Sequence, residues 1–88
     1  MQRENLLALL KEAADSHADE SFSFADKQQA TVYIAAGADL LTIDRVTEVV
    51  LRGGVAIVQT AKERFYADAE RVVAVRLHAG TDATGFIG

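Results

Sequence analysis

The residues best suited to metal chemistry are His17 and three carboxylates beside it, Asp15, Asp19 and Glu20. Imidazole and carboxylate groups are common ligands of divalent cations. The other histidine, His78, is distant in the sequence, and no pair of histidines at helical spacing marks a metal site. Acidic residues after a helix are more typical of a solvated loop, so we expect no metal and no cofactor.

Nucleophilic catalysis has little support in this sequence. The chain has no cysteine, and none of its three serines lies in a glycine-flanked turn between a strand and a helix. Gly53-Gly54 lacks the following lysine and helix of a phosphate-binding loop, so a tight turn explains both glycines. Because no acid, base or nucleophile has the spacing that a reaction requires, we expect a protein that is not an enzyme.

Arginine is unevenly distributed along the chain. Residues 45–88 contain six basic residues, five of them arginine, against five acidic residues, whereas residues 1–44 contain three basic and eight acidic residues. Guanidinium groups bind carboxylates and phosphates in a bidentate manner. Acidic residues lie between the arginines, so the favoured interpretation is cross-strand ion pairing, and a ligand site is the alternative.

A nucleic-acid-binding surface is one hypothesis for these arginines. Bases stack on exposed aromatic rings and guanidinium groups neutralise phosphates, so we expect such a surface to use Tyr33 or Tyr66 with four arginines: Arg45, Arg52, Arg64 and Arg76. Phe65 and Tyr66 are neighbours in a predicted strand, so only one of them faces outward. The net charge of −4 argues against this function.

The length of 88 residues predicts one domain, and 50% of the residues are hydrophobic. A chain of this size buries only about 60–65% of its unfolded surface, so self-association would cover apolar surface that the fold leaves exposed. The leucines near the N-terminus are interrupted by Lys11 and Glu12, which predicts neither a signal peptide nor a membrane span. The absence of cysteine fits a reducing compartment, and we expect a cytoplasmic protein.

Hydrophobic periodicity predicts one helix followed by strands. Apolar residues recur every three or four positions from Arg3 to Asp15 or Ser16, with Leu6, Leu9, Leu10 and Ala13 on one face. Alternating and β-branched residues then predict short strands. These cover residues 21–24, 31–35, 40–43, 46–51, 55–60, 64–67 and 72–77, and the two segments between 40 and 51 form either one long bent strand or two short ones.

The connections between these strands are too short for helical crossovers, so the predicted fold class is α+β with an antiparallel meander of five to seven strands. Gly53-Gly54 predicts a tight hairpin, and the polar connector 26–29 has the length of another. We expect a curled sheet, because an open one leaves two edges unprotected. One domain covers residues 1–78, and residues 79–88 are a predicted flexible tail.

The order of these elements resembles the small-barrel plan of Sm-like and SH3-like domains. The likeness rests on an N-terminal helix, a strand ending at Gly37, the Gly53-Gly54 hairpin and a short turn before the last strand. It covers roughly residues 3–77. The resemblance implies a small curled barrel, and it transfers no functional residue.

The favoured hypothesis is a non-enzymatic interaction module that forms homo-oligomers or docks on a protein partner through sheet edges or the helix. The segment 72–75 is apolar on both faces, although a small sheet normally buries one, which favours edge pairing there. The predicted partner-binding residues are Val72, Val73, Val75, Arg45, Arg52, Arg64 and Arg76. Nucleic-acid binding is the alternative.

Overall fold

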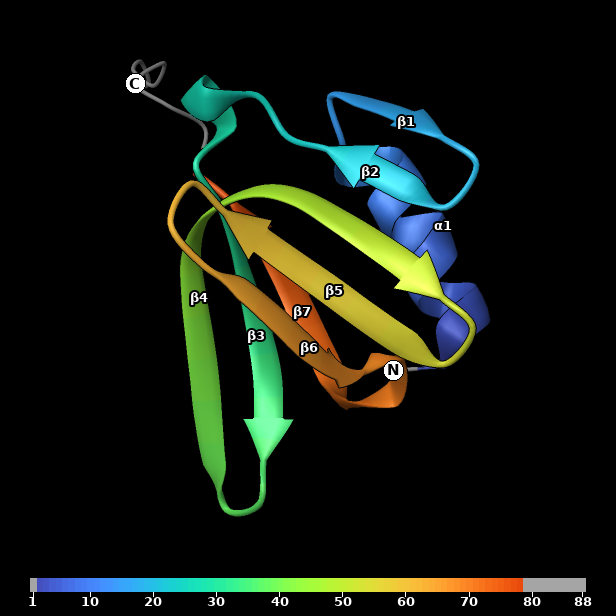
Figure 1. Cartoon of the computed structure of the whole chain (residues 1–88), viewed down its shortest axis with the longest axis vertical. Coiled ribbons are helices and arrows are strands. Elements are labelled where there is room, and N and C mark those ends of the chain that lie inside the picture. Colours follow the sequence, from blue (N-terminus) through green and yellow to red (C-terminus); the bar gives the residue numbers. More distant parts are fainter. Residues whose placement is uncertain (1, 79–88) are drawn as a thin grey trace, which may run out of the picture.

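The computed structural model describes residues 2–78 and contains one α-helix, two short 3-10 helices and seven strands in this part of the chain (Figure 1). In chain order the elements are α1 (Arg3–Ala13), β1 (Ser16–Ala18), β2 (Ser21–Ser23), η1 (Asp26–Gln28), β3 (Ala30–Ala36), β4 (Asp39–Arg52), β5 (Val55–Thr60), β6 (Arg64–Asp68), η2 (Ala69–Arg71) and β7 (Val72–Leu77). The α+β class and the antiparallel sheet are therefore confirmed, and residues 79–88, the predicted tail, lie outside the described part.

The helix buries the face that its periodicity indicates, with Leu6 and Leu10 almost inaccessible to solvent. It ends at Ala13, two or three residues earlier than expected. Ala14 is already extended, and the backbone N–H of Asp15 donates to the carbonyl of Ser23 at 2.9 Å. The polar segment that follows pairs with β2 as strand β1. A longer helix would gain no further apolar contact here, whereas strand pairing satisfies the backbone N–H and C=O groups of the segment.

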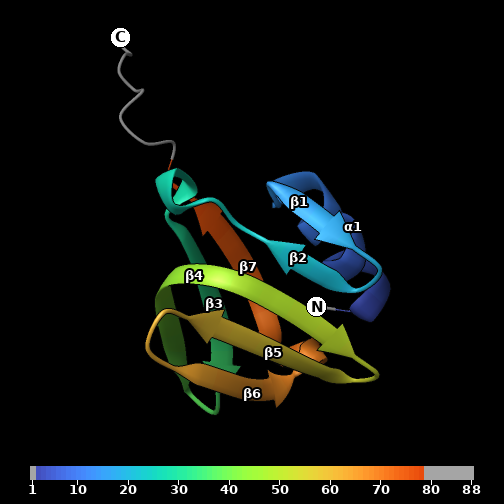
Figure 2. The same ribbon diagram turned by 45° about the horizontal axis from the view of Figure 1, so that its top comes forward.

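Strand β4 is a single long bent strand, one of the two forms expected. Arg45 has a positive φ of 56°, and the register of β4 shifts on both of its edges around this residue. Such bulges bend a strand and increase its twist. The first part of β4 consequently pairs with β3 and the second part with β5, and the sheet curls into a half-barrel, as the curled form predicted (Figure 2).

The sheet is not a simple meander. One path runs β1-β2-β4-β3-β7, while β5 and β6 extend from the other edge of β4. The expected hairpin at residues 26–29 is wrong, since η1 occupies the connector and β2 pairs with β4 rather than with β3. The Gln28 side chain holds this turn, accepting from the Ala25 backbone N–H at 2.7 Å and donating to the Ala13 carbonyl at 2.9 Å. The Gly53-Gly54 hairpin joins β4 to β5 as expected, with Gly53 at a φ of 63°.

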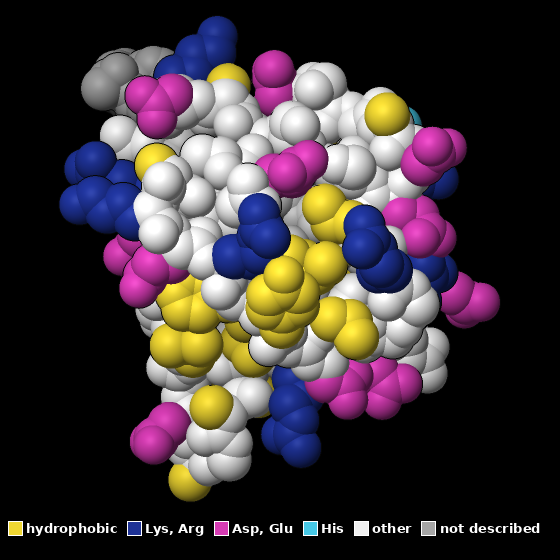
Figure 3. Space-filling model, viewed as in Figure 1, with side chains coloured by type: hydrophobic (Ala, Val, Ile, Leu, Met, Phe, Trp, Pro, Cys, Tyr) yellow, Lys and Arg dark blue, Asp and Glu magenta, His cyan; other side chains and the backbone are white. Residues whose placement is uncertain are grey.

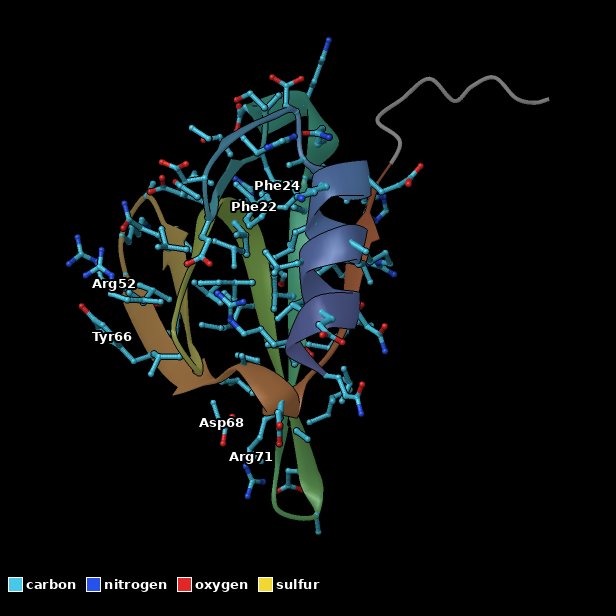
Figure 4. All side chains as sticks on the ribbon, turned by 90° about the vertical axis from the view of Figure 1, so that its right-hand side faces the viewer. Phe22, Phe24, Arg52, Tyr66, Asp68 and Arg71 are labelled. Carbon is cyan, nitrogen blue, oxygen red and sulfur yellow. The ribbon has the colours of Figure 1, made fainter. Side chains whose placement is uncertain are left out.

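The hydrophobic core lies between the concave side of the half-barrel and α1. Phe22 and Phe24 point into this space, which α1 closes from the opposite side (Figure 4). The helix contacts β7 and η2. The convex side of β4, β5 and β6 is left without a covering element among the described residues (Figure 2).

No helix within residues 2–78 combines the length and the apolar composition that a membrane-spanning segment needs.

Candidate protein-interaction surface

The convex side of β4, β5 and β6 carries the largest set of outward side chains that the sequence hypotheses invoked. Along these strands, alternate residues enter the core, so their neighbours face outward. We call the outward set the Tyr66 face, and it consists of Glu48, Val50, Arg52, Val55, Ile57, Gln59, Arg64, Tyr66 and Asp68.

Strand register places these side chains in three rows across the sheet. The central row is apolar and joins Val50, Ile57 and Tyr66. The row on one side contains Glu48, Gln59 and Arg64, and the row on the other side contains Arg52, Val55 and Asp68. Each row runs in the order β4, β5, β6, so β5 is the midline of the face.

The middle of the face exposes apolar surface. Tyr66 is 64% exposed and Val55 is 41% exposed, while Val50 and Ile57 are half-buried. Figure 3 shows a hydrophobic patch bordered by basic side chains on this side of the molecule. Phe65 packs against the core, which confirms that only one member of the Phe65-Tyr66 pair faces outward. An exposed tyrosine among aliphatic side chains has the composition of an interface centre.

Hydrogen bonds orient Arg64 over this patch. Its Nη1 donates to the Tyr66 hydroxyl at 3.5 Å, and its Nε donates to Oε1 of Gln59 at 3.2 Å. The hydrogen bond with Tyr66 raises the pKa of Arg64 above its ordinary value. Figure 4 shows Arg52 and Tyr66 projecting from the sheet on the side away from α1.

No ion pair joins the charged residues of the face to one another. The ion pair between Arg3 and Glu20 is the only one that joins residues within 2–78, so the expected cross-strand pairing of the arginines is not found there. Glu48 instead accepts from the Ser21 hydroxyl at 2.6 Å, and an Asp68 carboxylate oxygen accepts from the Glu70 backbone N–H at 3.0 Å. None of the four charges of the face therefore takes part in an ion pair within residues 2–78.

The four candidate arginines separate into two pairs. Arg52 and Arg64 belong to the Tyr66 face, whereas Arg45 and Arg76 line a shallow hollow at another end of the molecule. There the Arg76 guanidinium lies 3.4 Å from the His78 ring. Tyr33, the other tyrosine of the nucleic-acid hypothesis, is half-buried between β4 and β7 rather than beside Tyr66.

The apolar segment of β7 is only partly accessible. Val72 is 2% exposed and belongs to the core, so its side chain is not available to a partner. Val75 is partly buried against the core, and Val73 is 45% exposed at a register shift between β3 and β7. One apolar face of the segment packs against the core, and on the other face the bulge displaces Val73. The apolar pattern of this segment therefore does not require a partner at the edge.

The histidine cluster does not form a cation site in the described part of the chain. The His17 ring lies against Phe22 with ring centroids 5.8 Å apart. Within residues 2–78, no three histidine, aspartate or glutamate side chains are close enough to share a metal ion.

A hollow also opens at the mouth of the half-barrel, where Ile43 and Phe65 meet the turn that contains Lys62. It mixes apolar walls with charged side chains at its rim, and no hydrogen bond that the structure shows crosses it. The Tyr66 face is thus the better candidate, since its apolar centre and four charges form one continuous arrangement. Comparison of the chain with models of protein families, with curated proteins and with solved structures found no match.

Proposed function

We propose that this protein is a non-enzymatic interaction module that docks on a protein partner through the Tyr66 face. The observation that carries the proposal is the position of Tyr66, 64% exposed at the end of an apolar row, with Arg64 two residues before it on β6 and Arg52 on β4 at the far corner of the same face. Tyrosine and arginine are enriched among the residues that dominate binding energy at protein interfaces. Docking would remove the exposed apolar surface from water.

The proposal extends to the fold. We infer that the half-barrel follows the small-barrel plan of Sm-like and SH3-like domains. The support is that β4 bends and contributes to both halves of the sheet, and that the short helix η2 precedes β7, which pairs with β3. The additional strands β1 and β2 lie outside that plan.

Site-specific photo-cross-linking in cells of the natural host tests the docking surface. A photoreactive phenylalanine analogue replaces Tyr66 in one variant and Thr42 in a control. Thr42 is also exposed, but it lies opposite Tyr33 on the other half of the sheet. We expect a light-dependent covalent adduct of discrete mass from position 66, and its loss when Val50→Lys places a charge in the same row. Equal labelling from positions 66 and 42 would contradict the proposal.

Nucleic-acid binding is the second candidate function, and one observation favours it: Arg52, Arg64 and Tyr66 share one face. The carboxylates of Glu48 and Asp68 lie in the same rows, and they would repel phosphates. Fluorescence anisotropy with a labelled single-stranded oligouridine at low salt separates the two functions. Saturable binding that weakens with salt and with Tyr66→Ala would favour the nucleic acid, and no binding would remove it.

A further inference from the structure

We propose that the occupant of the Tyr66 face is a second copy of this chain, packed face to face about a two-fold axis that runs along β5. The inference rests on the proposed function, because it names the partner of that same surface. Three features of the face carry it: the arrangement of its charges, the sizes of its apolar side chains and its extent.

The charges occupy the four corners of the face in alternating sign. Across one outer row, Glu48 on β4 and Arg64 on β6 lie on opposite sides of Gln59. Across the other outer row, Arg52 on β4 and Asp68 on β6 lie on opposite sides of Val55. Each strand thus carries one acidic and one basic corner, and the order of the signs is reversed between β4 and β6.

A two-fold axis along β5 turns this alternation into complementarity. The axis leaves each row in register with itself but places β4 of one copy over β6 of the other. Glu48 then faces Arg64 of the second copy, and Arg52 faces its Asp68. Every arginine of the face meets a carboxylate, with each contact made twice by symmetry. Aligned packing of two sheets brings such outward side chains into contact.

The apolar row is also complementary under this axis. Tyr66 of one copy lies over Val50 of the other, and Ile57 meets its symmetry mate at the centre. A large side chain opposite a small one allows the two layers to interdigitate. An axis across the strands would also oppose unlike charges, pairing Glu48 with Arg52 and Arg64 with Asp68. That arrangement sets Tyr66 against Tyr66, two protruding rings at one point, so the axis along β5 fits better.

The size and curvature of the face predict a weak dimer. The three strands of the face, at roughly 4.8 Å spacing and about 20 Å of strand length, present only about 300 Å² of flat area. Convex faces touch along β5 and diverge toward β4 and β6, where the long side chains of Arg52 and Arg64 would span the gap. Interfaces smaller than about 1,200 Å² in total are typical of transient association, so we expect a micromolar dissociation constant.

Sedimentation equilibrium of the full chain at about 5–200 µM protein and low salt tests the pairing, since this range spans micromolar dissociation constants. Wild type should sediment as a monomer–dimer equilibrium. Glu48→Arg should weaken the dimer at least tenfold, because it places two arginines opposite each other at both symmetry-related contacts. The double variant Glu48→Arg/Arg64→Glu should recover dimerisation, because it exchanges the two signs that face each other across the axis.

A matched double variant identifies the axis. Glu48→Arg/Arg52→Glu carries the same charges, but under the axis along β5 both new residues face their own sign, so it should remain monomeric. The opposite result, with this variant dimeric and the Arg64 double variant monomeric, would overturn the axis along β5. Far-UV circular dichroism and urea unfolding of each variant distinguish dissociation from loss of folding.

The two proposals fail separately. Wild type that remains monomeric at 200 µM overturns the second copy as occupant, while a cross-linked adduct of a different mass from position 66 leaves the docking function standing. Absence of any adduct from position 66 together with a monomeric wild type overturns both. An adduct with the mass of two chains, lost in Glu48→Arg, supports both.

Discussion

At the scale of single residues, Arg45 determines the bend that shapes the half-barrel. It lies at a φ of 56°, where side chains with a Cβ are strained. Beside it, Asp44 accepts a hydrogen bond of 3.1 Å from the Thr31 hydroxyl, and Thr31 is the one buried polar side chain in residues 2–78. The bulge therefore combines backbone strain with a satisfied buried hydroxyl, which stabilises the bend against straightening.

Glycine at position 45 should be more stable than alanine at the same position. Both Arg45→Gly and Arg45→Ala remove the guanidinium, so the difference between them isolates the backbone. Glycine adopts a left-handed conformation without the cost of about 1 kcal/mol or more that a Cβ imposes. We expect the Gly variant to have a free energy of unfolding about 1 kcal/mol higher than the Ala variant, measured by urea denaturation. If the Ala variant were the more stable of the two, as in an ordinary strand, the bend would not be at Arg45.

At the scale of elements, α1 contributes to the core through few residues. Leu10 is 0% exposed and Leu6 is 1% exposed, while Leu9 on the same helix is partly buried. Truncation of a fully buried leucine removes its transfer free energy and leaves a cavity, which costs about 2–5 kcal/mol.

Leu10→Ala should therefore lower the free energy of unfolding by about 2–5 kcal/mol, and Leu9→Ala should lower it by a smaller amount. The helix propensity of the two variants is the same, so the difference reports packing alone. Thermal unfolding followed by circular dichroism measures both. Equal destabilisation would mean that α1 does not close the core as the structure indicates.

Much of this element order could be predicted from local sequence. The two-residue turn at Gly53-Gly54 sets the register of β4 and β5, so Val50 opposite Ile57 follows from the sequence alone once the hairpin is accepted. Sequence reasoning nevertheless missed Val50, Val55 and Ile57 as surface residues, because the apolar partner-binding residues that it named all lie in segment 72–75. The available signal was the alternation within the hairpin.

Other features depend on partners distant in the sequence. The three residues of strand β1 are all exposed, and the strand exists because β2 offers it backbone hydrogen bonds. Strand β2 pairs with β4 rather than with β3, because Gln28 holds η1 against the end of α1 and directs the chain away from a hairpin. No local pattern encodes these contacts. For the same reason, the separation of the four candidate arginines into two pairs could not be read from their spacing.

At the scale of the whole molecule, the fold has two sides of different character. One side holds α1 over the core, and the other presents the Tyr66 face uncovered within the described residues (Figure 4). The proposed association through that face would involve only the folded state, so it would add to the apparent stability by mass action. A small domain with a limited core gains proportionally more from such association.

The unfolding temperature should therefore depend on protein concentration. Well above the dissociation constant, each tenfold rise in protein concentration adds about 0.7 kcal/mol per chain to the apparent free energy of unfolding. This is half of the roughly 1.4 kcal/mol that a tenfold rise in a simple ligand adds, because two chains share each association. For a domain of this size, such a gain in free energy raises the unfolding temperature by a few degrees. Scanning calorimetry at several concentrations should show the rise for wild type and for Glu48→Arg/Arg64→Glu, but not for Glu48→Arg. A concentration-independent midpoint in wild type would leave the fold stabilised by its own core alone, with the Tyr66 face contributing nothing to it.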